Sequence, residues 1–68
     1  MDHETFNLGI RKFLKMVGVN SQREIEQAVS KALEAGELKG DETLRTQMML
    51  EIPALGLKVP FEGEIKLK

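Results

Sequence analysis

The sequence has no cysteine and only one histidine among its 68 residues. A disulfide is therefore impossible, and a structural zinc site would lack the thiolate and imidazole ligands on which most such sites depend. A chain of this length buries only about 60% of the surface that its unfolded form exposes, so its own core provides little stability. Oligomerisation is the remaining usual source of stability for so small a domain.

The sequence also lacks a long apolar run. Five charged residues interrupt the first 20 positions, namely Asp2, Glu4, Arg11, Lys12 and Lys15. Neither the uncharged segment of a signal peptide nor an 18-residue membrane span is present, so we expect no membrane partner. Because the absence of cysteine suits a reducing compartment, the sequence predicts a cytoplasmic protein.

No segment has a strong excess of one charge. Residues 1–19 carry three basic and two acidic side chains, residues 20–37 carry two and four, and residues 38–68 carry five of each. Binding to the phosphates of DNA or RNA requires clustered positive charge. Nucleic acid is therefore not an expected partner.

Apolar residues recur at helical spacing in the first part of the chain. They are Phe6, Ile10, Phe13, Leu14 and Val17. Such spacing places them on one stripe of an amphipathic helix. Asp2 suits the N-cap of this helix and Gly18 suits its C-terminal end. The pattern predicts a first helix over residues 3–17.

A second set of helix signals follows at once. Ser21 and Glu24 have the spacing of a capping box, and Gly36 is a typical C-terminal glycine. The apolar positions between them are Ile25, Ala28, Val29, Ala32 and Leu33. These residues predict a second helix over 22–35, joined to the first by a tight corner at residues 18–21.

The last third of the chain predicts a β-hairpin. Apolar and polar residues alternate over 44–52 and over 57–67, and Pro53, Ala54, Leu55 and Gly56 form a four-residue loop between them. With Ile52 opposite Leu57, the apolar residues of both strands fall on the same face. Residues 36–43 are a polar connection with two glycines, flexible enough for the hairpin to fold onto its own helices or onto those of a neighbour.

The resulting fold class is α+β, with two N-terminal helices and a C-terminal antiparallel hairpin in one domain over residues 1–68. Because Pro60 lacks an N–H, its strand lies at an edge there or is bulged, and the first strand keeps an edge free for pairing. A two-stranded ribbon is marginal by itself. We therefore expect a homodimer in which first strands join into a four-stranded sheet, with or without exchange of hairpins.

No residue pattern predicts catalysis or cofactor binding. Two serines and one terminal histidine provide no nucleophile and base at a known spacing, so an enzyme is not expected. The acidic clusters Asp41-Glu42 and Glu62-Gly63-Glu64 fall on loop or outward positions and are predicted to be solvated. Met1-Asp2-His3 has the spacing of a Cu(II) or Ni(II) chelate, which many unfolded termini share, so no metal-site residue is predicted.

The corner at Gly18 is similar to the turn of a DNA-binding helix-turn-helix, but only loosely. Ile25 lies seven positions after Gly18 instead of six, and Leu14 stands where a small residue is usual. The exposed face of the second helix would also present carboxylates to phosphates, since it includes Glu24, Glu26 and Glu34. A nucleic-acid-binding regulator is the alternative function.

Nearly the whole chain resembles a family of short uncharacterised bacterial proteins, a domain of unknown function. The resemblance rests on residues 4–7, 10–15, 17–19, 21–26 and 62–65, most specifically on the segment from Gly18 to Glu26. It implies a cytoplasmic bacterial homodimer with a helix-helix-hairpin fold and supplies no activity. The leading hypothesis is a homodimeric structural or protein-interaction module acting through an unknown protein partner. A ligand-binding module is a third possibility and would require an apolar pocket.

Overall fold

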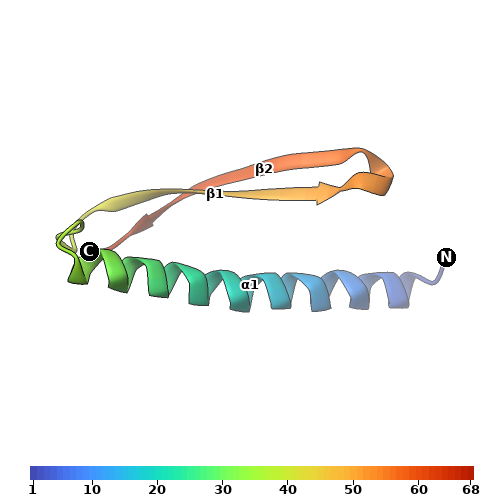
Figure 1. Cartoon of the computed structure of the whole chain (residues 1–68). Helices are drawn as coiled ribbons and strands as arrows, with labels where there is room; N and C mark the ends of the chain where they lie inside the picture. Colours follow the sequence, from blue (N-terminus) through green and yellow to red (C-terminus); the bar gives the residue numbers. More distant parts are fainter. The chain divides into compact units, whose positions relative to one another are not determined.

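A computed structural model describes residues 1–68 and contains one helix followed by one antiparallel hairpin (Figure 1). The elements are α1 (His3–Glu34), β1 (Thr43–Ile52), the short 3-10 turn η1 (Pro53–Leu55) and β2 (Leu57–Lys66). The chain divides into two units, Met1–Glu37 and Leu38–Lys68, and each is described by itself. The α+β class and the hairpin are confirmed.

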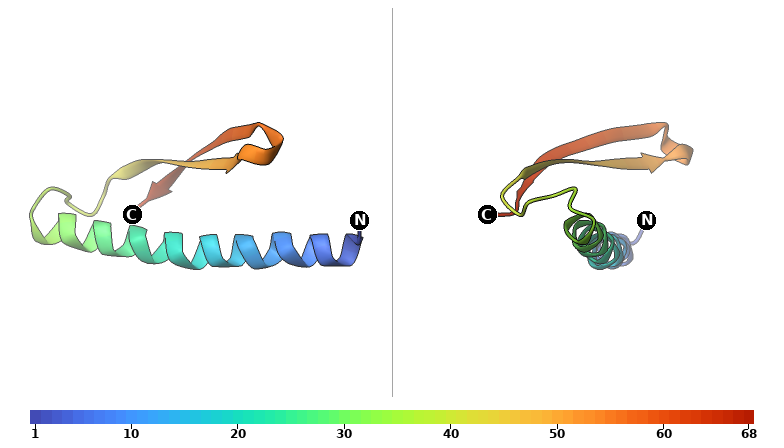
Figure 2. Two further views of the ribbon diagram at one scale, coloured as in Figure 1. Left: turned by 45° about the vertical axis from the view of Figure 1, so that its right-hand side comes forward. Right: turned by 60° about the vertical axis from the view of Figure 1, so that its left-hand side comes forward.

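The prediction of two helices was wrong, because α1 runs without a break from His3 to Glu34 (Figures 1 and 2). Gly18 lies within the helix and is not among the glycines with positive φ. A glycine inside a helix costs about 1 kcal/mol. Ending one helix and starting another would leave four carbonyls and four N–H groups without helical partners, so continuation is the cheaper outcome.

The apolar stripe is continuous across the position of the predicted corner. Val17, Ser21 and Ile25 follow one another at intervals of four and are all half-buried. Ser21 and Glu24 therefore occupy helix-interior positions, where a capping box has no orphan N–H groups to satisfy. The helix-turn-helix similarity disappears with the corner.

Both ends of α1 carry strong capping signals, and these were predicted correctly. The Asp2 carboxylate accepts hydrogen bonds from the backbone N–H groups of Glu4 at 3.0 Å and Thr5 at 3.3 Å. At the other end, Gly36 has φ +74°, and the Gly36 and Glu37 N–H groups donate to Leu33 at 3.2 Å and Ala32 at 2.9 Å. This pair of bonds is the Schellman motif.

Two glycine substitutions test the continuity of α1. Gly18→Ala is expected to raise the free energy of unfolding by up to about 1 kcal/mol, because alanine favours a helix interior and the new Cβ would meet open space. Gly36→Ala is expected to lower it by about 1 kcal/mol, because its φ is left-handed. Urea denaturation followed by circular dichroism measures both. If Gly18→Ala destabilised the chain as Gly36→Ala does, Gly18 would end a helix and α1 would be broken.

The hairpin has the predicted register throughout. Ile52 pairs with Leu57, and the ladder continues through Leu50 and Val59 to Thr43 and Lys66. The Leu67 N–H donates to the Glu42 carbonyl at 2.9 Å and extends the pairing by one residue. Register is fixed because a slip of one residue would move every apolar side chain to the other face.

The hairpin loop is short and regular. Pro53, Ala54 and Leu55 form η1, and Gly56 follows with φ +63°, where its N–H donates to the Pro53 carbonyl at 3.1 Å. Proline starts such a turn well and glycine accepts the left-handed end. The four residues of the predicted loop are thus the loop of the structure.

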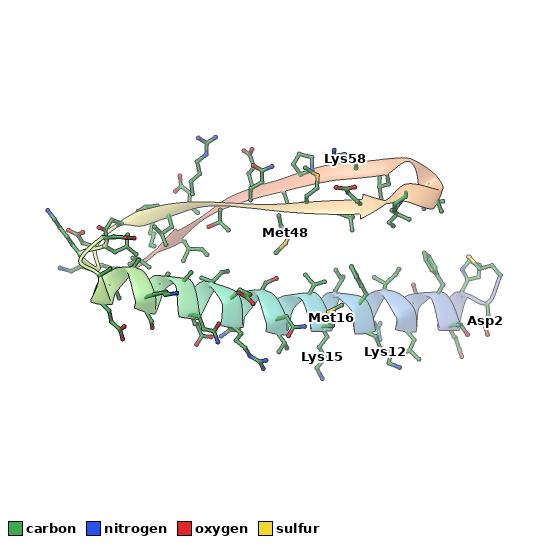
Figure 3. All side chains as sticks on the ribbon, in the orientation of Figure 1. Asp2, Lys12, Lys15, Met16, Met48 and Lys58 are labelled. Carbon is green, nitrogen blue, oxygen red and sulfur yellow. The ribbon has the colours of Figure 1, made fainter.

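The two faces of the hairpin differ in polarity. Met48 and Lys58 point to opposite sides of the ribbon (Figure 3). The Met48 side carries the apolar residues of both strands, and the Lys58 side carries mostly charged and polar ones, as strand alternation requires. No residue in the chain is buried, so neither unit contains a core.

Candidate interaction surfaces

The first surface is the apolar stripe of α1, defined by Phe6, Ile10, Phe13, Leu14, Val17, Ser21, Ile25, Ala28, Val29 and Ala32. Its N-terminal half is the more exposed, because Phe6 is 52% and Phe13 is 49% exposed. Fully burying a side chain of this size is worth about 1.5–3 kcal/mol. A row of such side chains in water favours association with another apolar surface.

Basic residues accompany this exposed half. No acidic residue occurs between Glu4 and Glu24, and this segment contains Arg11, Lys12 and Lys15. Lys12 and Lys15 point to the same side of α1 (Figure 3). At 100° per residue they lie away from the apolar stripe, so their charges stay in water while the stripe is free to pack. The helix is therefore amphipathic over its N-terminal half.

The second surface is the apolar face of the hairpin. Phe61 and Met48 pair across the ladder and remain 57% and 43% exposed. Five further apolar residues on this face are half-buried, namely Leu44, Leu50, Leu57, Val59 and Ile65. A two-stranded ribbon needs more strands or a covering layer to be stable. This face is accordingly a second place where the chain lacks a partner.

The third surface is the outer edge of β1. Leu67 and Glu42 are a hydrogen-bonded pair of the antiparallel ladder. Hydrogen-bonded and non-hydrogen-bonded pairs alternate along such a ladder, so Met49 and Pro60 are a non-hydrogen-bonded pair. Pro60 therefore interrupts only the outer edge of β2. On β1 the outward backbone groups belong to Thr43, Arg45, Gln47, Met49 and Glu51, all of which have both N–H and C=O. Only the β1 edge offers an uninterrupted row of donors and acceptors.

Glu42 organises the chain just before β1. Its carboxylate accepts hydrogen bonds from the Lys39 N–H at 2.8 Å and from the Gly40 N–H at 2.9 Å, while Gly40 has φ +101°. These bonds, with that from Lys39 first, hold the pKa of the Glu42 carboxyl below its usual range. This role was missed in the sequence, where Asp41-Glu42 was assigned only to a solvated cluster. The sequence signal for this role is that an acidic residue, Glu42, follows the flexible pair Lys39 and Gly40 by three and two residues.

The Glu42 bonds predict a local pH effect. Because the folded pKa of Glu42 is lowered, the carboxylate stabilises this turn above the unfolded pKa, and the stabilisation is lost as the pH falls through the folded pKa. We expect the Lys39 and Gly40 amide resonances to titrate with a midpoint below that of an ordinary glutamate. In Glu42→Gln this transition should vanish, and both amides should exchange faster. Amide resonances that titrate at the ordinary glutamate pKa would contradict the arrangement.

The other acidic and metal-binding candidates of the sequence are not brought together. Glu62 and Glu64 lie on the outer face of β2, opposite Gln47 and Arg45. No group of three or more His, Asp or Glu side chains lies where it could hold a metal ion. The Asp2 carboxylate is engaged in capping α1, and its bonds from Thr5 and Glu4 lower its pKa.

The surface of α1 has two depressions. One is lined by Val19, Gln22, Arg23, Glu26 and Gln27, and the other by residues from Glu26 to Glu34. Both have walls from a single helix and are therefore open, unlike the enclosed apolar pockets that hold small ligands. The helix α1 is not apolar enough over any membrane-length stretch to cross a bilayer.

Comparison with known proteins gives one result. Searches of curated proteins and of solved structures found no match. A protein-family model, described as a family of unknown function (DUF6494), matches residues 1–68. The match covers all of α1, the connection and the hairpin, so the surfaces described above lie within the family domain. The chain therefore belongs to the family of unknown function DUF6494.

Proposed function

We propose that this chain is a cytoplasmic structural or protein-interaction module whose working unit is a homodimer. The observation that carries the proposal is that no residue of the chain is buried, although α1 and the hairpin each have an apolar face. A second copy is the partner that is always present at matching concentration. A twofold axis also lets each chain cover the same surface on the other.

The edge of β1 supports a specific way of joining the two copies. Two β1 strands paired across a twofold axis turn two ribbons into one four-stranded antiparallel sheet, a size at which sheets are ordinarily stable. Pro60 interrupts the outer edge of β2, which supports β1 as the edge that joins the two copies. The union also removes an exposed edge, which is otherwise a site of aggregation.

A matched pair of proline variants tests this edge. Gln47 and Glu62 are directly opposite, and both belong to non-hydrogen-bonded positions. Proline at either site removes an outward N–H and leaves the bonds between β1 and β2 intact. Gln47→Pro is expected to raise the dimer dissociation constant at least tenfold, about 1.4 kcal/mol, whereas Glu62→Pro should leave it nearly unchanged.

Analytical ultracentrifugation measures the dissociation constants, and circular dichroism checks that both variants keep their secondary structure. Equal weakening by both prolines would mean that the loss comes from the hairpin itself, and the β1 edge would not be the interface. A wild-type chain that stays monomeric at high micromolar concentration would rule out the homodimer.

The nucleic-acid alternative has no observation in its favour. The turn on which it rested does not exist, since Gly18 lies inside α1. We therefore propose the homodimeric module alone.

A further inference from the structure

We infer that the β1 edges of two copies pair in antiparallel orientation with the twofold axis at Met48, and that Arg45 and Glu51 select this register. The register rests on the proposed homodimer and names the residues through which one copy recognises the other. It concerns the hairpin alone, and it follows from the direction of the backbone groups of β1 and from the side chains beside them.

The backbone of β1 limits the registers that two copies can adopt. Its outward N–H and C=O groups belong to the odd-numbered residues from Thr43 to Glu51. Antiparallel strands exchange both bonds of a hydrogen-bonded pair, so an outward residue must face an outward residue of the second copy. Odd-numbered residues therefore pair with odd-numbered ones, and the twofold axis is level with a residue. Over β1, which ends at Ile52, the greatest overlap places this axis at Gln47 or at Met48.

The polar face of β1 distinguishes these two registers by charge. With the axis at Met48, Arg45 lies directly opposite Glu51 of the second copy, and the twofold axis makes this contact twice. In the other register, Arg45 would face Met49 of the second copy. Glu51 would face Thr43, so neither charged side chain would meet an opposite charge. Opposite charges that face each other directly stabilise an antiparallel sheet, whereas like charges destabilise it.

The charges of β2 extend this pattern across the joined sheet. Within one chain, Glu51 lies opposite Lys58, and Arg45 lies opposite Glu64. With the axis at Met48, a row across the sheet reads Lys58, Glu51, Arg45 and Glu64, of which the last two belong to the second copy. The sign of the charge thus alternates at every step. Because all these side chains are exposed, salt screens their attraction, and they select the register more than they add affinity.

The apolar face fits the same register. At the axis, Met48 meets Met48 of the second copy, and this side chain is 43% exposed within one chain. Leu44 comes level with Ile52 of the second copy. Leu50 comes level with Thr46, whose hydroxyl already donates to the Leu44 carbonyl at 3.3 Å. Apolar side chains therefore meet apolar ones, and the one hydroxyl among them has a partner.

The register with its axis at Gln47 fits this face less well. It would bring Ile52 level with Glu42 of the second copy, just before β1. The Glu42 carboxylate is held there as a charged group by bonds from Lys39 and Gly40. An apolar side chain would then lie beside a carboxylate, with no gain from its burial. The apolar and charged rows lie on opposite sides of the ribbon (Figure 3), so each favours the Met48 axis independently.

Charge-reversal variants test the contact between Arg45 and Glu51. In Arg45→Glu both positions are acidic, and in Glu51→Arg both are basic, so each variant alone sets like charges opposite each other. In a mixed dimer, every such contact is an opposite pair again. The mixture contains the same hairpins as the separate samples, so a recovery in the mixture cannot come from the stability of the hairpin. Sedimentation equilibrium at low ionic strength measures the dissociation constants, and circular dichroism checks the secondary structure.

Each charge-reversal variant alone is expected to raise the dimer dissociation constant at least about tenfold. The mixture should return to within about threefold of the wild type, and added salt should reduce the difference between mixed and separate samples. A mixture that binds no more tightly than the separate variants would overturn the assigned contact.

Single cysteines test the axis without any change of charge, because the chain has no cysteine of its own. In Met48→Cys the two cysteines would face each other in a non-hydrogen-bonded pair, with Cα atoms about 4.5 Å apart. A disulfide needs Cα atoms within about 7 Å. Gln47→Cys is the matched control on the adjoining residue. Its two copies would be displaced by about 7 Å along the strands in addition to about 5.5 Å across them.

After oxidation in a glutathione buffer, Met48→Cys is expected to give at least about tenfold more linked dimer than Gln47→Cys on non-reducing gels. The opposite order would place the axis at Gln47 and overturn the inference. Linking at Met48 without recovery in the charge mixture would mean that apolar faces stack while the edges stay apart, which also overturns it.

The mass of the wild-type chain separates failure of the register from failure of the proposed homodimer. Equal linking of both cysteine variants, or none, with a dimeric wild-type mass would overturn the register and leave the homodimer standing. A monomeric wild-type mass would overturn both.

Discussion

Replacing Leu50 with glutamate is expected to abolish the dimer at micromolar concentration and to unfold most of the hairpin. Leu50 lies on the apolar face of β1, opposite Val59, and is already half-buried within one chain. This face needs a covering layer to be stable, and a carboxylate at position 50 would be left without a partner under any such cover. We expect a loss of at least about 3 kcal/mol, or more than a hundredfold in the dissociation constant. Light scattering and circular dichroism measure the two effects.

Met49→Lys is the matched control, because it places a charge on the neighbouring residue of the same strand. Met49 points to the opposite, polar face of the hairpin and is 42% exposed. This variant should remain folded and dimeric, with a change in stability within about 0.5 kcal/mol. If Met49→Lys disrupted the dimer and Leu50→Glu did not, the Lys58 side of the ribbon would be the interface.

Truncating Phe13 to alanine is expected to weaken the dimer by about 3 kcal/mol per chain, because large-to-alanine substitutions in a packed interface lose both apolar burial and packing. Phe13 lies on the stripe of α1 and is 49% exposed within one chain. Because alanine is the better helix former, the helix content of a monomer should not fall. Sedimentation equilibrium measures the dissociation constant, which reports the loss of dimer affinity separately from any change in helix content.

Leu8→Ala serves as the comparison for Phe13→Ala. Leu8 is 58% exposed, and at 100° per residue it lies opposite the stripe, beside Lys12 and Lys15. Its truncation should leave the dissociation constant within about threefold of the wild type, since it removes no interface contact. Equal losses from Leu8 and Phe13 would mean that the interface is not confined to the stripe.

The hairpin could be predicted from the sequence almost residue by residue. Alternation over 44–52 and 57–67 set the faces, the Pro53 to Gly56 loop set the register, and Pro60 required an edge, as the structure confirms. These signals are local, and each one excludes the alternatives. A shift by one residue would expose Leu50 and Val59 to water and turn charged residues inward.

The helices were harder because the signals at residues 18–24 are ambiguous. Gly18 and the Ser21 to Glu24 spacing are typical of helix ends, yet glycine also occurs inside helices at a cost of about 1 kcal/mol, and serine and glutamate do so at a smaller cost. The decisive signal was the unbroken stripe, since Val17, Ser21 and Ile25 keep helical spacing across the corner. A corner between two helices would have interrupted the helical spacing of these three residues.

The surfaces were predicted in part. The free edge of β1 follows from Pro60 alone, and the apolar face of the hairpin follows from alternation. The continuity of the stripe could not be seen while two helices were assumed, because it joins residues from both of them. The Glu42 bonds depend on the conformation of Gly40, which no sequence pattern specifies.

In the proposed homodimer, the folded chain is completed by a second copy of itself. The most direct test of this proposal is the solution mass of the wild-type chain by light scattering, measured over a dilution series down to low micromolar concentration. A homodimer is expected to have twice the chain mass of 7.7 kDa throughout this range, with secondary structure unchanged. A folded particle with the mass of one chain at every concentration would contradict it.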